Sequence, residues 1–222
     1  MMSPIGRECF EQLHSDGLAA SKAGNHEQAL DSFERAGRVA NAYEDRHKLI
    51  HAMTPAARAL WSMGRYDEAT EKLEHCATLA ERLRLRDEQG ITISNLGRIA
   101  AHRILHTEGV ENTEAALRGE AVPRFAEAYE ILKGHPHLYY RYANAQHGSI
   151  ISAYAGERSL AATLIAEGLR VAPRVSAEPY DRVRTYTINR GGIVQMLTAA
   201  LLLPAGGRTP VIANMSKARL IR

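Results

Sequence analysis

The sequence contains few cysteines and has no apolar run long enough to cross a membrane. Its two cysteines, Cys9 and Cys76, are distant from each other in the sequence, so they indicate neither a disulfide framework nor a zinc cluster. The longest apolar run, residues 196–206, is shorter than the roughly 20 residues that span a bilayer. The first ten residues lack the apolar stretch of a signal peptide. We therefore expect a cytoplasmic protein that does not interact with membranes.

Aromatic residues are also scarce, at 6% of the 222 residues, whereas alanine is abundant. This composition favours helices that pack closely through small side chains over a β-sandwich or a barrel. Apolar residues make up 45% of the chain and charged residues 24%, which is enough for one domain with a core or for one short solenoid. We expect an all-α protein.

The net charge of +3 is unevenly distributed along the chain. Residues 172–222 contain eight Arg or Lys residues and two acidic residues, so the remainder of the chain is net negative. A basic C-terminal segment can bind nucleic acid or an acidic partner, or it can be a solvated tail. We favour a tail, or a cap on the last helices, over nucleic-acid binding.

Two stretches of the sequence repeat each other. Residues 23–40 align with residues 63–80 without a gap, and a small residue, a large residue and a second small residue recur in both. A helical pattern precedes each stretch, and its own small residue recurs at the same offset as Gly17, Ala57 and Gly97. The aligned pairs are Gly24 and Gly64, Ala29 and Ala69, Phe33 and Leu73, and Ala36 and Cys76.

This small-large-small pattern resembles the tetratricopeptide repeat family, in which two antiparallel helices form each unit. The period of about 40 residues is longer than the usual period of about 34 residues. It is similar to the longer repeats of kinesin light chains and of the sensor domains of bacterial transcriptional regulators, and SNLG at residues 94–97 is nearest to their signature. The resemblance implies an α-solenoid, a right-handed superhelix of antiparallel helix pairs whose first helices line a concave groove.

The resemblance assigns residues 8–203 to a repeat domain and residues 204–222 to a basic capping segment or tail. The third repeat holds an insertion at residues 107–118, where Asn112 or Thr113 is expected to cap a short helix. The insertion either covers one rim of the groove or is a tolerated surface loop. The predicted repeats span residues 8–44, 46–85, 86–134 and 136–173, and a terminal helix spans residues 178–203.

The side of each first helix that lies opposite its small residue is expected to face the groove. In the third repeat Gly97 points toward the second helix, whereas Asn95 and Arg98 point away from it. Asn95, Gln146 and Asn189 occupy the same position in three successive repeats, and carboxamides can pair with the backbone of an extended peptide. The predicted peptide-binding residues are His51, Arg58, Asn95, Arg98, His102, Tyr139, Tyr142, Gln146 and Asn189.

Several of these residues have a simpler interpretation. Arg58 and Arg98 share a groove position and together favour an acidic side chain or a C-terminal carboxylate in the ligand, yet a polar residue on an exposed helix face is often only solvated. Tyr139 and Tyr142 either anchor a peptide or pack by their rings with only the hydroxyl exposed. Pro55 takes the carboxamide position in the second repeat, where it either kinks the helix or begins a new one.

Chemistry beyond binding is weakly indicated. The pairs His47 with His51 and His102 with His106 have the i, i+4 spacing of metal ligands, but neither has a third His or an acidic residue at close spacing. Cys76 takes a small-residue position and is expected in the core. No phosphate-binding glycine loop and no nucleophile motif occurs. We therefore expect no metal, no cofactor and no enzymatic activity.

The sequence favours a non-catalytic protein- or peptide-binding module that holds a segment of a partner protein in the groove. Asn, Gln and Arg side chains would make the contacts. Two alternatives stay open. One is a structural scaffold that oligomerises through its terminal repeats, for example as a homodimer, and the other is a regulatory protein that senses a peptide.

Overall fold

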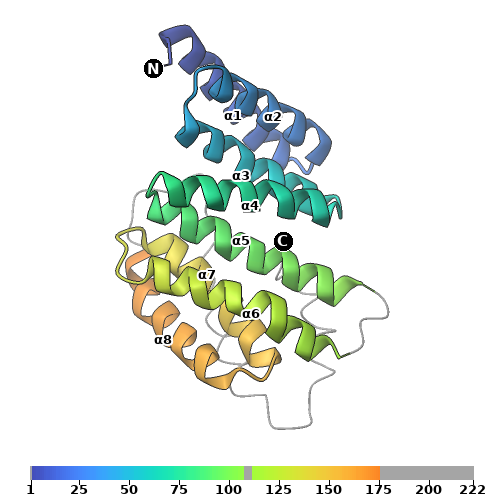
Figure 1. Cartoon of the computed structure of the whole chain (residues 1–222), viewed down its shortest axis with the longest axis vertical. Helices are drawn as coiled ribbons and strands as arrows, with labels where there is room; N and C mark the ends of the chain where they lie inside the picture. Colours follow the sequence, from blue (N-terminus) through green and yellow to red (C-terminus); the bar gives the residue numbers. More distant parts are fainter. Residues whose placement is uncertain (1, 108–111, 176–222) are drawn as a thin grey trace. The chain divides into compact units, whose positions relative to one another are not determined.

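The computed structural model describes residues 2–107 and 112–175, and all regular structure in these residues is α-helical (Figure 1). This confirms the predicted all-α class for the described part of the chain. Within it, no helix is long and apolar enough to cross a membrane. The predicted terminal helix at 178–203, the segment 204–222 and Asn189 lie outside the described residues. The helices are α1 (Pro4–Lys22), α2 (His26–Ala42), α3 (Arg46–Ser62), α4 (Tyr66–Arg82), α5 (Arg86–His106), α6 (Thr113–Leu132), α7 (Leu138–Tyr154) and α8 (Arg158–Val175).

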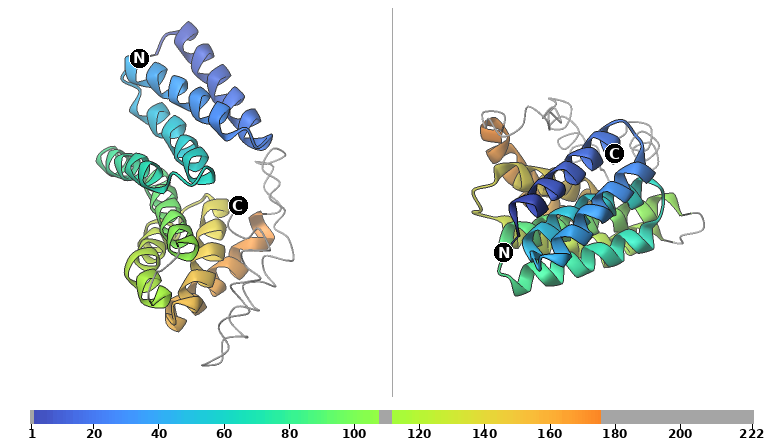
Figure 2. Two further views of the ribbon diagram at one scale, coloured as in Figure 1. Left: turned by 90° about the vertical axis from the view of Figure 1, so that its right-hand side faces the viewer. Right: turned by 90° about the horizontal axis from the view of Figure 1, so that it is seen from above.

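The described residues divide into two compact units, one that ends at Thr92 and one that begins at Ile93, with the boundary inside α5. In the first unit α1 packs on α2, α2 on α3, and α3 on α4. In the second unit α6 packs on α7, and α7 on α8. Consecutive helices within each unit thus lie side by side and run antiparallel (Figure 2).

The turns of the first unit are evenly spaced along the chain. Helices α2, α3 and α4 are each 17 residues long, and turns of equal length join each to the next. In each turn one residue has a left-handed backbone; at Gly64, for example, its N–H donates to the C=O of Trp61 and the N–H of Arg65 donates to the C=O of Leu60, both at 3.0 Å. This is the Schellman pattern of helix ends. Each sequence repeat is therefore built from two helix-turn units of equal length. The left-handed residues are Gly24, Glu44, Gly64 and Arg84.

Small residues of the odd-numbered helices lie against large residues of the even-numbered ones, as the repeat pattern predicts. In the first unit, a Cβ placed on Gly17 of α1 would lie 2.7 Å from Cε1 of Phe33, which is itself buried. In the second unit, Phe125 of α6 contacts Gly97 of α5 and Gly148 of α7. Helices can cross this closely only where one of them lacks a side chain.

Helix α6 corrects the predicted shape of the insertion. Asn112 does cap a helix, because its side chain accepts the N–H of Ala115 at 3.1 Å. That helix is not short, however: it continues through Pro123 to Leu132 as the second helix of the third repeat. Residues 113–118 of the predicted insertion therefore form the first turns of α6.

Helix α3 also continues through a proline, so Pro55 does not begin a new helix. Proline has no N–H, and the C=O of His51, four residues earlier, therefore loses its helical partner. Nε2 of His14 in α1 lies 3.2 Å from this oxygen, where an N–H can donate to it. The neighbouring helix thus compensates for the hydrogen bond that Pro55 cannot make.

Candidate functional site

Polar side chains link helices that are separated by one intervening helix in the first unit. Nζ of Lys48 in α3 lies 2.5 Å from Oε1 of Glu11 in α1. Nζ of Lys72 in α4 lies 3.0 Å from Oε1 of Glu34 in α2. One ion pair therefore links the odd-numbered helices α1 and α3, and the other links the even-numbered helices α2 and α4. Such exposed pairs contribute little stability individually, at about 0 to 1 kcal/mol, but they fix which residues face one another.

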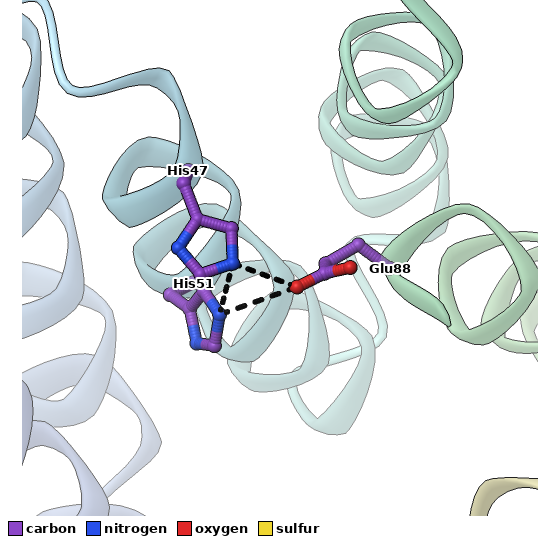
Figure 3. A group of neighbouring side chains, drawn as sticks. All are labelled: His47, His51 and Glu88. Atoms are coloured by element: carbon purple, nitrogen blue, oxygen red, sulfur yellow. Dashed lines mark hydrogen bonds and ion pairs between the residues drawn. The ribbon is translucent and has the colours of Figure 1, made fainter. Parts of the chain in front are cut away.

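The most concentrated of these links joins α3 to α5 through His47, His51 and Glu88 (Figure 3). The two histidines are four residues apart on α3 and so share one face of the helix. Nε2 of His47 lies 2.8 Å from Oε1 of Glu88 and 3.3 Å from Nε2 of His51. Nε2 of His51 lies 3.6 Å from the same carboxylate oxygen. Two imidazole nitrogens and one carboxylate oxygen therefore converge on a single point.

Glu88 is charged at neutral pH. Hydrogen bonding from His51 and His47 holds the pKa of Glu88 far below its ordinary value, although burial of the carboxylate acts in the opposite direction. The neighbouring Asp87 behaves differently, since burial and its hydrogen bond to Glu88 raise its pKa. A negative charge is thus held at a position that is only 13% exposed.

The donor set is chemically distinctive. Among the described residues, His47, His51 and Glu88 form a group of three potential metal ligands whose ligand atoms all lie within 4.8 Å of one another. Imidazole nitrogen and carboxylate oxygen are ligands that first-row transition metals accept. The other predicted pair, His102 and His106, has its ring centroids 4.1 Å apart but is not part of such a group.

The predicted groove residues of the first unit are accessible. His51 is half exposed and belongs to the cluster with Glu88. Arg58, two helical turns further along α3, is partly exposed. Both residues therefore remain candidates for ligand contacts, with His51 already engaged by Glu88.

In the second unit, most of the predicted groove residues are partly exposed. Asn95 is held by its own helix, because its Oδ1 accepts from Nη1 of Arg98 at 3.3 Å. The remaining partly exposed ones are His102, Tyr139 and Gln146.

Tyr142 corrects the groove prediction. It is only 3% exposed and packs in a core cluster between α7 and α8. Its ring therefore belongs to the interior of the second unit and is unavailable to a peptide. The other members of this cluster are Leu138, Ile165, Val171 and Ala172.

His147 of the second unit is a polar residue outside the predicted groove set. Its Nδ1 donates to the C=O of Ala143, one turn earlier in α7, at 2.8 Å. Loss of hydration and the nearby positive charge of Arg98 lower the pKa of His147 to about 3. His147 is therefore neutral at physiological pH. Nothing in the sequence around His147 indicates that its side chain is held in the neutral form.

Glu88 is also outside the predicted set, although the repeat period indicates its position. It lies 41 residues after His47, so no local motif connects them. Lys48 and Glu88, however, are separated by one repeat length and take the same position in successive repeats. First helices of successive repeats lie next to each other in a stack of helix pairs. The repeat offset therefore predicts that the start of α5 faces the start of α3.

No protein-family model matches the sequence, and a search of curated proteins finds no similar sequence. A helical fold by itself is compatible with many functions, so function has to be argued from particular residues. Two groups of residues carry that argument: the partly exposed polar side chains of the odd-numbered helices, and the cluster of His47, His51 and Glu88.

Proposed function

We propose that this protein is a non-catalytic binding module, an α-solenoid of tetratricopeptide-like helix pairs that holds a segment of a partner protein against its first helices. The observation that carries the proposal is the division of α5 into two faces. Gly97 lies against Phe125 of α6, whereas Asn95 and Arg98 on the other side stay partly exposed. A helix that uses one face for packing leaves the other accessible to a ligand.

The solenoid part of the proposal is supported by regularity along the chain. The first four turns are evenly spaced, and each consecutive pair of helices in the first unit packs together. The ion pairs from Glu11 to Lys48 and from Glu34 to Lys72 each connect a helix to its counterpart in the next repeat. Repeats that contact mainly their neighbours are the defining property of solenoids.

The chemistry of the exposed faces favours an extended peptide with acidic character. Oδ1 of Asn95 is occupied by Arg98, so its amide nitrogen is the group that can donate to a peptide carbonyl. Gln146 of α7 offers a second carboxamide in the same unit, and Arg98 of α5 offers a guanidinium there. Guanidinium groups bind carboxylates well, including the one at a peptide C-terminus.

A peptide library displayed on phage can test the proposal before any partner is identified. Peptides are selected on the wild-type protein, and their affinities are then measured by fluorescence anisotropy for the double variant Asn95→Ala, Gln146→Ala. We expect at least about tenfold weaker binding, which corresponds to about 1.4 kcal/mol. Thr163→Ala on the exposed side of α8 is the matched control and should bind as the wild type does. Equal affinity for the double variant would reject the proposed face.

A scaffold that self-associates is the second candidate, and one observation favours it. Ile5 of α1 is 79% exposed, and burying such a large apolar side chain against a second copy would be favourable. If α1 mediates self-association, Ile5→Glu lowers the molar mass measured by light scattering after gel filtration. If wild type and variant have the same mass, α1 is not an interface.

A further inference from the structure

We infer that His47, His51 and Glu88 form a binding site for a divalent transition-metal ion, and that zinc is the ion that the donor set fits best. The two histidines come from one face of α3, and the carboxylate comes from the first turn of α5 (Figure 3). The proposal goes beyond peptide binding and does not depend on it.

The three donor atoms already have the spacing of ligands on one ion. They are separated by 2.8, 3.3 and 3.6 Å. A circle through three points at these separations has a radius of about 1.9 Å, which is shorter than zinc–ligand bonds of about 2.0 to 2.2 Å. An ion about 2.1 Å from all three atoms would lie about 0.9 Å above their plane, between the roughly 0.7 Å of tetrahedral and the roughly 1.2 Å of octahedral coordination. The separations of the three donor atoms therefore fit one ion bound by all of them.

The chemistry of the donors selects the class of ion. Two imidazoles and one carboxylate are a known set for zinc sites that keep an open position. Magnesium and calcium prefer shells made entirely of oxygen, so they are poor matches. Glu88 carries a negative charge that offsets part of the charge of the ion, and its low exposure strengthens that attraction.

Access to the site is open from solvent. The side chains of His47 and His51 are 52% and 49% exposed, so an ion can reach both nitrogens without local unfolding. Three protein ligands leave at least one coordination position for water or for an atom of another molecule. The bound ion would also join α3 to α5, and it is expected to raise the stability of the first unit.

The surrounding residues hold the ligands in place. His47 and His51 are successive on the helix face, with ring centroids 4.5 Å apart. The backbone oxygen of His51 is held by His14 of α1, because Pro55 leaves that oxygen without a helical partner. Ligands on rigid helices with such support lose less entropy when an ion binds.

Isothermal titration of zinc chloride into the chelator-stripped full-length protein tests the inference. The wild-type protein should bind one zinc ion per chain. His51→Ala and Glu88→Gln should each weaken binding by at least about tenfold, because loss even of groups that only orient a ligand costs about that much. His102→Ala, in the other i, i+4 histidine pair, should leave the affinity unchanged. Magnesium chloride should not displace the zinc.

The cobalt ion supplies an independent readout of the same ligands. Cobalt(II) bound to the wild-type protein should give visible absorption bands, and His47→Ala should remove them while the far-UV circular dichroism spectrum stays unchanged. Half-exposed histidines can be replaced without loss of the core, so the fold is expected to survive. Zinc affinity that is the same in wild type, His51→Ala and Glu88→Gln would overturn the inference, as would loss of the site in His102→Ala.

Discussion

Two glycines inside helices of the first unit should respond in opposite ways to substitution by alanine, because only one of them lies at a close helix crossing. Gly17 of α1 and Gly37 of α2 both lie inside helices of the first unit. A Cβ at Gly17 would lie 2.7 to 2.9 Å from three ring atoms of Phe33, whereas a Cβ at Gly37 would meet its nearest neighbours at 3.7 and 3.8 Å. The first substitution to alanine therefore creates a clash, and the second creates an ordinary contact.

The two effects that compete have known sizes. Replacing a helical glycine by alanine gains about 0.5 to 1 kcal/mol in helix propensity. Overpacking a core costs about 1 to 3 kcal/mol. Gly17→Ala should therefore lower the free energy of unfolding by up to about 2.5 kcal/mol, and Gly37→Ala should raise it by up to about 1 kcal/mol.

The second unit supplies the same contrast. A Cβ at Gly148 would lie 2.8 Å from Cδ1 of Leu164 and 3.0 Å from Cβ of Phe125, whereas a Cβ at Gly119 would have no such neighbour within 4 Å. Gly148→Ala should destabilise and Gly119→Ala should stabilise. Gly97 is intermediate, because an added Cβ would lie 3.2 Å from its nearest neighbour. The gain in helix propensity and the cost of overpacking should therefore nearly cancel in Gly97→Ala.

Urea unfolding followed by far-UV circular dichroism measures all five variants, because the described structure is helical. Close crossing at Gly17 and Gly148 is refuted if their alanine variants raise the unfolding midpoint as Gly37→Ala and Gly119→Ala do. That outcome would mean that the helices do not cross closely at the small residues.

Three further predictions concern single residues. Burial raises the pKa of Cys76 to about 12, so iodoacetamide should modify only the exposed Cys9 in the native protein. Cys76 should react after unfolding. Equal reaction rates at both thiols in the native protein would contradict the burial of Cys76. Glu44 has a left-handed backbone with φ of 55°, so Glu44→Gly should raise the free energy of unfolding by about 1 kcal/mol, whereas no gain in a thermal melt would contradict strain there. His147 stays neutral in the folded protein down to about pH 3, but it titrates near pH 6.5 in the unfolded chain. Its contribution to the free energy of unfolding is therefore complete above pH 6.5. As the pH falls from 6.5 toward 3, that contribution is lost by up to about 1.4 kcal/mol per pH unit. His147→Gln should flatten that dependence, and an unchanged slope would show that other groups cause it.

Local and periodic features of the fold were predictable from the sequence. The contact between Gly17 and Phe33 follows from a small-large-small pattern that recurs in the next repeat, so the sequence itself holds the information. The helical class follows from alanine content and from the spacing of apolar residues.

Features that depend on a neighbouring helix were not predictable in this way. Whether Pro55 ends a helix depends on what compensates for its missing N–H, and here His14 of another helix supplies the partner. Tyr142 lies on a face that a single-helix projection assigns to the groove, but α8 covers it. Glu88 completes a cluster with histidines that are about one repeat away, which only the register between repeats could reveal.

Peptide binding along the first helices can be observed residue by residue through chemical-shift mapping. A peptide selected from the library is added to ¹⁵N-labelled protein, and the side-chain amide signals of Asn95 and Gln146 are followed. We expect these two signals to shift in proportion to occupancy, together with backbone signals of α5 and α7. Shifts confined to α6 and α8, with both side-chain amides unmoved, would contradict it.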